Sequence, residues 1–229
     1  MKKIGILGGT FDPVHNGHLG LVAEIQEALH LDRILLVPVH HSPHKQGRFA
    51  ASFEHRMDML RLAVGSAPNL EISDVEIKRG GTSYTIDTLG ALETQYPNKE
   101  FNLILGTDTF EDFHSWKKAT AIAAKCNLIV GKRPGFAGKS PEQFSKDLFG
   151  NGTNTYLPEH QEEKIRIFRH TAIKRSLTFI ELVPRNISSR EIRRKIYNHQ
   201  SPKNMLPPEV EHYIMSHRLY QAESRPDMG

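Results

Sequence analysis

The chain has 229 residues, and its 30 Lys and Arg against 26 Asp and Glu give a formal net charge of +4. Hydrophobic residues make up 38% of the sequence and charged residues 24%, a composition that supports a folded core and excludes an intrinsically disordered chain. No apolar stretch approaches the roughly 18 to 20 residues of a membrane-spanning helix, and the first residues lack the apolar core of a signal peptide. We therefore expect a cytoplasmic protein with no membrane partner.

The basic residues are unevenly distributed along the chain. Between Lys164 and Lys195 there are ten basic and two acidic residues, so this segment carries +8 and the rest of the chain −4. Such a concentration of charge indicates an anionic partner, either a nucleic-acid backbone or a small phosphorylated ligand. The single cysteine, Cys126, excludes an internal disulfide and a zinc site built from cysteine pairs.

Short apolar runs alternate with segments of helical periodicity. Residues 3–8 form an apolar run that ends in glycine, a helical pattern follows through Leu29, and residues 34–39 form the next apolar run. Further helical patterns lie at 53–67, 84–92 and 208–219, and strand-like patterns lie at 70–77, 101–105, 127–130 and 179–183. This alternation predicts an α/β fold with a Rossmann-like, doubly wound parallel sheet, C-terminal helices and a ligand site at the carboxyl ends of the strands.

Residues 1–220 are expected to form a single domain. Gly, Ser and Asn are frequent between residues 135 and 154, so we expect an irregular insertion over about residues 137–176. Residues 221–229 are expected to be a flexible tail.

The loop after the first apolar run carries the most informative motif, which reads GGTFDPVHNGH over residues 8–18. Paired glycines allow a ligand to approach the backbone, and a helix N-terminus offers free N–H groups to an anion. His15 and His18 add two imidazoles, which can stabilise charge that develops on a phosphate during transfer. This motif resembles the signature of the HxGH nucleotidyltransferases, and specifically that of the nicotinate-nucleotide adenylyltransferases.

Four later segments are similar to further elements of that family. They are HSPHK at 41–45, SYTIDTL at 83–89, Gly106 and Asp108 followed by Trp116, and ISSREIR at 187–193. Read without the family, Thr82 or Ser83 caps one helix, and Ser188 with Glu191 forms a capping box at another. The departure from the family pattern is His41, where a more apolar neighbourhood is expected.

The resemblance implies transfer of AMP from ATP to nicotinate mononucleotide, giving nicotinate adenine dinucleotide and pyrophosphate in NAD biosynthesis. The implied catalytic residues are His15, His18, Lys45 and Arg193. The implied ATP-binding residues are Gly8, Gly9, Thr10, Phe11, His15, His18, Gly106, Asp108, Ile187, Ser189 and Arg193. The implied residues for nicotinate mononucleotide are Thr10, His44, Lys45, Ser83, Tyr84, Thr85, Asp108, Trp116 and Arg133. Mg²⁺ is expected to arrive mainly with ATP, with Asp108 as the candidate protein ligand.

Other readings stay open at this level. The acceptor substrate could be nicotinamide mononucleotide, or the chain could be another HxGH nucleotidyltransferase, such as one acting on phosphopantetheine. A function of a different class is a nucleic-acid-binding module formed by residues 164–195. Such a module needs aromatic residues among its cations, and this segment has only Phe168 and Phe179. We expect no nucleic-acid partner, and the sequence leaves open whether the chain forms a homo-oligomer.

Overall fold

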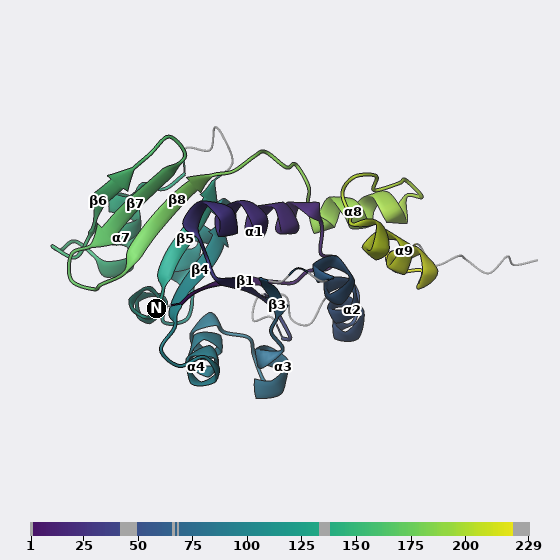
Figure 1. The fold of residues 1–229 in the computed structure, drawn as a ribbon, viewed down its shortest axis with the longest axis horizontal. Coiled ribbons are helices and arrows are strands. Elements are labelled where there is room, and N and C mark those ends of the chain that lie inside the picture. Colours follow the sequence, from purple (N-terminus) through teal and green to yellow (C-terminus); the bar gives the residue numbers. More distant parts are fainter. Residues whose placement is uncertain (1, 42–49, 66, 68, 133–137, 222–229) are drawn as a thin grey trace, which may run out of the picture.

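The computed structural model describes residues 2–41, 50–65, 67, 69–132 and 138–221. Its centre is a sheet in the order β3-β2-β1-β4-β5-β8-β7-β6 (Figure 1). The strands are β1 (Lys3–Gly9), β2 (Arg33–Pro38), β3 (Leu70–Ile72), β4 (Glu100–Gly106), β5 (Asn127–Lys132), β6 (Tyr156–Gln161), β7 (Ile165–His170) and β8 (Ser176–Glu181). From β3 to β8 all neighbouring strands are parallel, whereas β7 and β6 are antiparallel to their neighbours. The predicted α/β fold with a mostly parallel sheet is confirmed.

Helices cover both faces of the sheet, with α1 on one face and α3 and α4 on the other (Figure 1). The helices are α1 (Asn16–Leu29), α2 (Phe53–Val64), α3 (Val75–Arg79), α4 (Thr85–Gln95), α5 (Thr107–Glu111), α6 (Ala119–Lys125), α7 (Pro141–Phe149), α8 (Ser189–Tyr197) and α9 (Pro208–Ser216), with a short 3-10 helix η1 (Phe113–Ser115). None of the helices in the described residues is both long and apolar enough to cross a membrane.

The apolar runs form central strands because both of their faces are buried. Successive side chains point to opposite sides of a strand, so Leu103 and Leu105 join one core cluster while Ile104 joins the other. The first cluster packs against α4 and α6, and the second packs against α1 and α2. The crossover connections between these strands give them all the same direction, which brings their carboxyl ends to one edge of the sheet.

One predicted strand is wrong in its second half. The strand expected over residues 70–77 ends at Ile72, and Val75–Arg79 forms the single-turn helix α3. Gly80 ends this helix with φ +70°, a conformation that glycine adopts without strain. A short apolar pattern does not distinguish a strand from one helical turn, so the tertiary contacts of Val75 decide the structure here.

The expected irregular insertion over residues 137–176 is also wrong in character. Its described part forms α7, β6 and β7, and the two strands extend the sheet beyond β8. β6 is an edge strand in which only Tyr156 is buried, so it lacks the apolar alternation that would have predicted it. The shared sheet supports the single domain proposed for residues 1–220, and residues 222–229 of the predicted tail lie outside the described residues.

Candidate active site

A cavity of about 650 Å³ opens at the carboxyl ends of β1, β2 and β4. Its lining includes Gly8, Gly9, Thr10, His18, Ser83, Tyr84, Thr85, Gly106 and Trp116. A second cavity of about 340 Å³ lies beside it, between α1, α5 and the connection from β8 to α8. His18, Leu21, Gly106 and Thr109 line both cavities, so the two cavities adjoin at these residues. We call them the larger and the smaller cavity.

His15 and His18 form a stacked pair at the N-terminus of α1. Their ring centroids are 3.7 Å apart, with an angle of 21° between the ring planes. The backbone N–H of His18 donates to His15 Nδ1, and the backbone N–H of His15 donates to His18 Nδ1, each over 3.3 Å. This reciprocal capping satisfies two of the free amides of the helix start with imidazole nitrogens.

The hydrogen bonds also determine how the two imidazoles carry their protons. Because each Nδ1 accepts a hydrogen bond, each ring carries its proton on Nε2 and is neutral. Burial lowers the pKa of His15 to about 4. Burial and the neighbouring His15 lower the pKa of His18 well below its usual value. At neutral pH the pair therefore offers two N–H donors and no positive charge.

The first loop is held by buried polar contacts that the sequence motifs did not predict. The Asp12 carboxylate accepts hydrogen bonds from the backbone N–H groups of Ala50 and Ala51 and from the Tyr220 hydroxyl. Burial and the nearby Asp12 raise the pKa of Tyr220, so this hydroxyl keeps its proton. Tyr220, at the far end of the chain, thus fixes the loop that precedes the histidines.

A second buried group, Arg56 on α2, lies beneath the same loop. Its side chain is fully buried and donates to the carbonyl oxygens of Thr10 (2.8 Å) and Val39 (2.9 Å). It thereby joins the segments that follow β1 and β2, which is where the larger cavity opens. Arg56 was not among the predicted site residues. Its spacing of three and four residues from Met59 and Leu60 places it on the buried face of α2, and this spacing could have indicated a buried arginine.

The glycines of the motif allow close packing in the loop. A Cβ atom on Gly9 would lie 2.9 Å from the ring of Phe11, which is too close for two carbon atoms. The Phe11 ring in turn meets His18 edge to face, with ring centroids 5.0 Å apart. Phe11 therefore supports His18 from within the core, and it lines neither cavity.

The N-terminus of α4 faces the larger cavity through Ser83, Tyr84 and Thr85. The expected cap by Thr82 or Ser83 is wrong: Tyr84 is the N-cap residue, and no side chain caps this helix. Among the described residues, nothing accepts a hydrogen bond from the amides of Thr85 and Ile86. The helix therefore presents free N–H donors beside the cavity, which suits a negatively charged ligand group.

Ser83 has a different role from capping. Its Oγ accepts hydrogen bonds from the backbone N–H groups of His40 and His41, each over 3.2 Å. Its hydroxyl hydrogen remains available as a donor to a ligand. The buried carboxylate of Glu76 also lines the cavity and accepts hydrogen bonds from Thr88 Oγ1 and the backbone N–H of His40. Glu76 was not among the predicted site residues.

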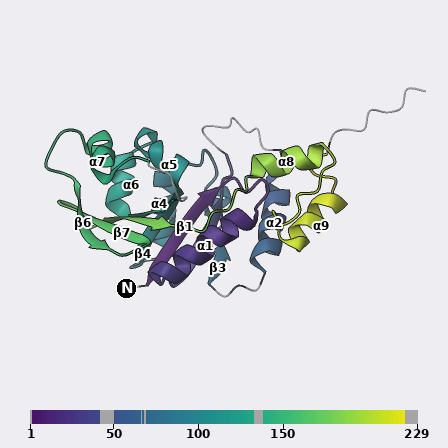
Figure 2. The same ribbon diagram turned by 90° about the horizontal axis from the view of Figure 1, so that it is seen from above.

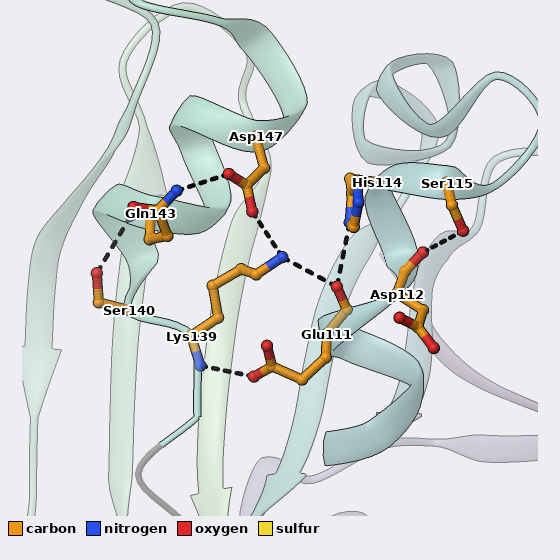
Figure 3. A network of polar contacts seen from close by, with 8 residues as sticks. All are labelled: Glu111, Asp112, His114, Ser115, Lys139, Ser140, Gln143 and Asp147. Carbon is orange, nitrogen blue, oxygen red and sulfur yellow. Dashed lines mark hydrogen bonds and ion pairs between the residues drawn. The ribbon is translucent and has the colours of Figure 1, made fainter.

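Trp116 also lines the larger cavity and is partly buried against Phe113. It follows α5 and η1, and Lys139, just before α7, joins the end of α5 to α7 (Figure 3). The Lys139 Nζ donates to the Glu111 carbonyl over 2.9 Å and pairs with Asp147 over 2.6 Å, while its backbone N–H donates to Glu111 Oε1. The insertion thus braces the segment that carries Trp116.

Ile187, Ser189 and Asp108 line the smaller cavity, together with both histidines. Asp108 is exposed and lines only this cavity, although it was predicted to contact both substrates. Ser188 caps α8 by accepting a hydrogen bond from the Glu191 amide, which confirms half of the predicted capping box. The return bond from the Ser188 amide to the Glu191 side chain is absent among the described residues.

Ser189 and Arg193 tie α8 to the first loop. The Ser189 hydroxyl donates to the Pro13 carbonyl over 2.9 Å, and the Arg193 guanidinium donates to the Asp12 carbonyl over 2.6 Å. Arg193 lies outside the lining of both cavities, so these contacts give it a structural role in the described residues. Its catalytic role remains a proposal. The predicted His44, Lys45 and Arg133 lie outside the described residues.

The site fits a metal ion that arrives with a polyphosphate. The described residues contain no group of three or more His, Cys, Asp or Glu side chains arranged to hold a metal ion. Asp108 is the one carboxylate in the described lining of the smaller cavity. A single carboxylate matches Mg²⁺, which keeps several waters and binds through one or two carboxylates together with substrate phosphates.

Comparison with known sequences gives a consistent family. A model of the cytidylyltransferase-like family matches residues 6–195. A probable nicotinate-nucleotide adenylyltransferase of Geotalea daltonii is 39% identical over 219 residues, which cover 95% of this chain and 98% of the relative. The same enzyme from Geobacter metallireducens is 36% identical over 221 residues, which cover 95% and 98%.

Solved structures share the fold. Nicotinic acid mononucleotide adenylyltransferase of Plasmodium falciparum, complexed with NaAD, aligns with a TM-score of 0.72 and 21% identity over 96% of this chain and 98% of that chain. The same enzyme complexed with APC aligns with a TM-score of 0.69 over the same shares of the two chains. At this level of identity the likeness establishes the fold alone.

Proposed function

The chain belongs to the cytidylyltransferase-like family and, within it, to the nicotinate-nucleotide adenylyltransferases, and we propose that it transfers AMP from ATP to nicotinate mononucleotide. The products are nicotinate adenine dinucleotide and pyrophosphate, and the reaction is a step in NAD biosynthesis. The observation that carries the proposal is the pair of adjoining cavities that share His18. Two substrates bound side by side would bring their phosphates together at the imidazole pair.

We assign nicotinate mononucleotide to the larger cavity. Trp116 offers an aromatic surface for the pyridine ring, and the free amides of Thr85 and Ile86 offer donors for its carboxylate. A carboxylate only accepts hydrogen bonds, whereas a carboxamide has an NH₂ group that cannot use such donors. This supports nicotinate over nicotinamide as the pyridine substrate.

We assign ATP to the smaller cavity, next to the N-terminus of α8. Ser189 and the start of α8 lie at this cavity, and helix N-termini favour phosphate groups. The Mg²⁺ that accompanies the triphosphate would contact Asp108 and neutralise part of the negative charge of the triphosphate.

The reaction needs alignment of the phosphates more than it needs a base. A phosphate oxygen of the mononucleotide attacks the α-phosphorus of ATP, the new P–O bond forms, and the bond to the β-phosphate breaks as pyrophosphate leaves with the electron pair. A phosphate monoester has a second pKa near 6, so the nucleophile is mostly a dianion at neutral pH and requires no general base. The neutral Nε2–H groups of His15 and His18 donate to the oxygens on which negative charge spreads.

Pyrophosphate release tests the proposal. The protein is incubated with MgATP and, in separate reactions, nicotinate mononucleotide, nicotinamide mononucleotide and phosphopantetheine. We expect rapid release with the first and much slower release with the others. Equal turnover of the two pyridine nucleotides would refute the selectivity, and no release with nicotinate mononucleotide would refute the activity itself.

The proposed substrates also bear on location and partners. Because ATP is the proposed donor substrate, we place the enzyme in the cytoplasm. The proposal gives no role to a nucleic acid, and the homo-oligomer left open by the sequence is not needed to complete either cavity in the described residues.

A further inference from the structure

The connection from β8 to α8 crosses the first two turns of α1, and Glu24 holds it there. The Val183 backbone N–H donates to Glu24 Oε2 over 2.8 Å, and the Arg185 guanidinium pairs with Glu24 Oε1. The two side chains are only 33% and 24% exposed, for Arg185 and Glu24 respectively. Arg185 and Lys164 hold the pKa of Glu24 below its usual value despite partial burial.

Gly20 provides the space in which Arg185 lies. A Cβ atom at this position would clash with the guanidinium carbon and two of its nitrogens, at nearly equal distances. The plane of the guanidinium therefore packs face-on against the helix. Glycine inside a helix is less favourable than alanine, so the close approach of Arg185 is a physical reason for glycine here.

Arg185 also lines the smaller cavity, whose lining is chemically mixed. It includes the apolar Leu21, Leu182 and Val183 together with Gly131, besides the proposed phosphate-binding groups His15, His18 and Ser189. The charge of Arg185 is matched by Glu24, so it is a poor free counter-ion for a triphosphate. A planar guanidinium with apolar neighbours instead suits a flat, aromatic ligand group.

We propose that Arg185 forms the wall on which the adenine ring of ATP stacks, and that Gly20 and Glu24 hold this wall in place. This inference rests on the assignment of ATP to the smaller cavity. Arg185 belongs to the basic segment of residues 164–195, but none of the predicted site residues or motifs included Arg185, Gly20 or Glu24.

The Gly20→Ala variant tests the proposal at the contact itself. The added methyl group must displace Arg185, so we expect a several-fold weaker affinity for MgATP, while the helix preference of alanine offsets part of the stability lost with the Arg185–Glu24 contact. The KM for nicotinate mononucleotide should stay near its wild-type value. Gly90→Ala in α4 is the matched control, because a Cβ at Gly90 meets no atom within 4 Å.

A double-mutant cycle separates Arg185 from other effects of the methyl group. Arg185→Leu should weaken MgATP binding several-fold, and adding Gly20→Ala to it should have little further effect, because the displaced side chain is gone. Full additivity of the two changes, or wild-type ATP affinity of Arg185→Leu, would overturn the proposal.

The choice of ligand distinguishes base stacking from charge. Calorimetric titration with MgATP and with inorganic triphosphate should show that Arg185→Leu weakens ATP binding much more than triphosphate binding. Equal weakening of the two would overturn stacking. Binding is measured without the second substrate, so these results stand even if the wild-type protein releases no pyrophosphate, an outcome that refutes only the proposed function.

Discussion

At the scale of single residues, the site uses imidazoles as neutral donors. His15 and His18 each accept a backbone N–H at Nδ1, which leaves the Nε2–H of each ring for a ligand. Two stacked rings at this distance could not both be charged without strong repulsion. In the proposed reaction, positive charge at the phosphates would therefore come from the Mg²⁺ that accompanies ATP and from cationic side chains.

The first prediction concerns His18, which lies where the two cavities meet. His18→Ala should lower kcat by roughly 10²–10³-fold while changing the KM for ATP much less, because it removes a donor needed mainly in the transition state. Steady-state pyrophosphate release measures both constants. His30→Asn, at the exposed C-terminal end of the same helix, is the control and should behave like the wild type. A near-normal kcat for His18→Ala would remove His18 from catalysis.

The second prediction concerns pH and His15. Its pKa is about 4 in the folded protein and about 6.5 in an unfolded chain, so the unfolded state binds more protons between these values. Stability should therefore fall as the pH falls through this window, with a His15 contribution of about 2 kcal/mol between pH 6.5 and pH 5. Urea unfolding at several pH values measures it. His15→Asn keeps a capping acceptor but does not titrate, so its stability should depend less on pH; an identical dependence would contradict the assignment.

At the scale of elements, α5 and η1 are too short to be stable alone, and their position comes from packing against β4, β5, α6 and α7. Lys139 places its ammonium group at the C-terminal carbonyl of α5, where a cation is favoured, and at the Asp147 carboxylate (Figure 3). Hydrogen bonding from Lys139 holds the pKa of Asp147 below its usual value. Lys139 and Asp147 of the insertion therefore support the wall of the larger cavity through α5, although neither residue lines that cavity.

The third prediction tests this brace. Lys139→Met should lower the free energy of unfolding by about 1–3 kcal/mol, because it removes the ammonium donor shared by the Asp147 carboxylate and the Glu111 carbonyl. It should also change the fluorescence of Trp116, the only tryptophan of the chain. Lys146→Met, at an exposed position of α7, is the control. If both variants unfold alike and keep the wild-type emission, Lys139 does not position Trp116.

At the scale of the whole molecule, the basic segment is divided between two ends. Figures 1 and 2 show β7 at one end of the molecule and α8 at the other, next to α9. Several cations of the β7 end have partners within the chain: Arg169 pairs with Glu159, and Arg175 donates to the Ala124 carbonyl. The segment therefore does not present the one continuous surface that the nucleic-acid hypothesis requires.

The fourth prediction follows from this division. The double variant Arg169→Gln with Lys174→Gln removes two cations of the β7 end, neither of which lines the larger or the smaller cavity. Its kcat and its KM for ATP should match those of the wild type at low and at moderate salt. A raised KM for ATP at low salt would show instead that this end of the molecule attracts the nucleotide electrostatically.

The sequence predicted the central strands and the first loop well, because both depend on local patterns. Residues 101–105 are apolar throughout, which is typical of a strand buried on both faces, and the loop from Gly8 to His18 has glycines and histidines at a specific spacing. The insertion was mispredicted because β6 exposes almost every side chain and so lacks the alternation of apolar and polar residues that marks a strand. It forms a strand because it pairs with β7.

By itself, the sequence determined the class of fold and the edge of the sheet at which the two cavities open. Only the tertiary structure decided that the imidazoles are neutral, that Arg193 contacts the first loop, and that Arg56, Glu76, Tyr220 and Arg185 belong to the site. The reason is physical. Periodicity and motifs report on neighbours along the chain, whereas pKa values, buried hydrogen bonds and cavity walls arise between residues such as Asp12 and Tyr220 that folding alone brings together.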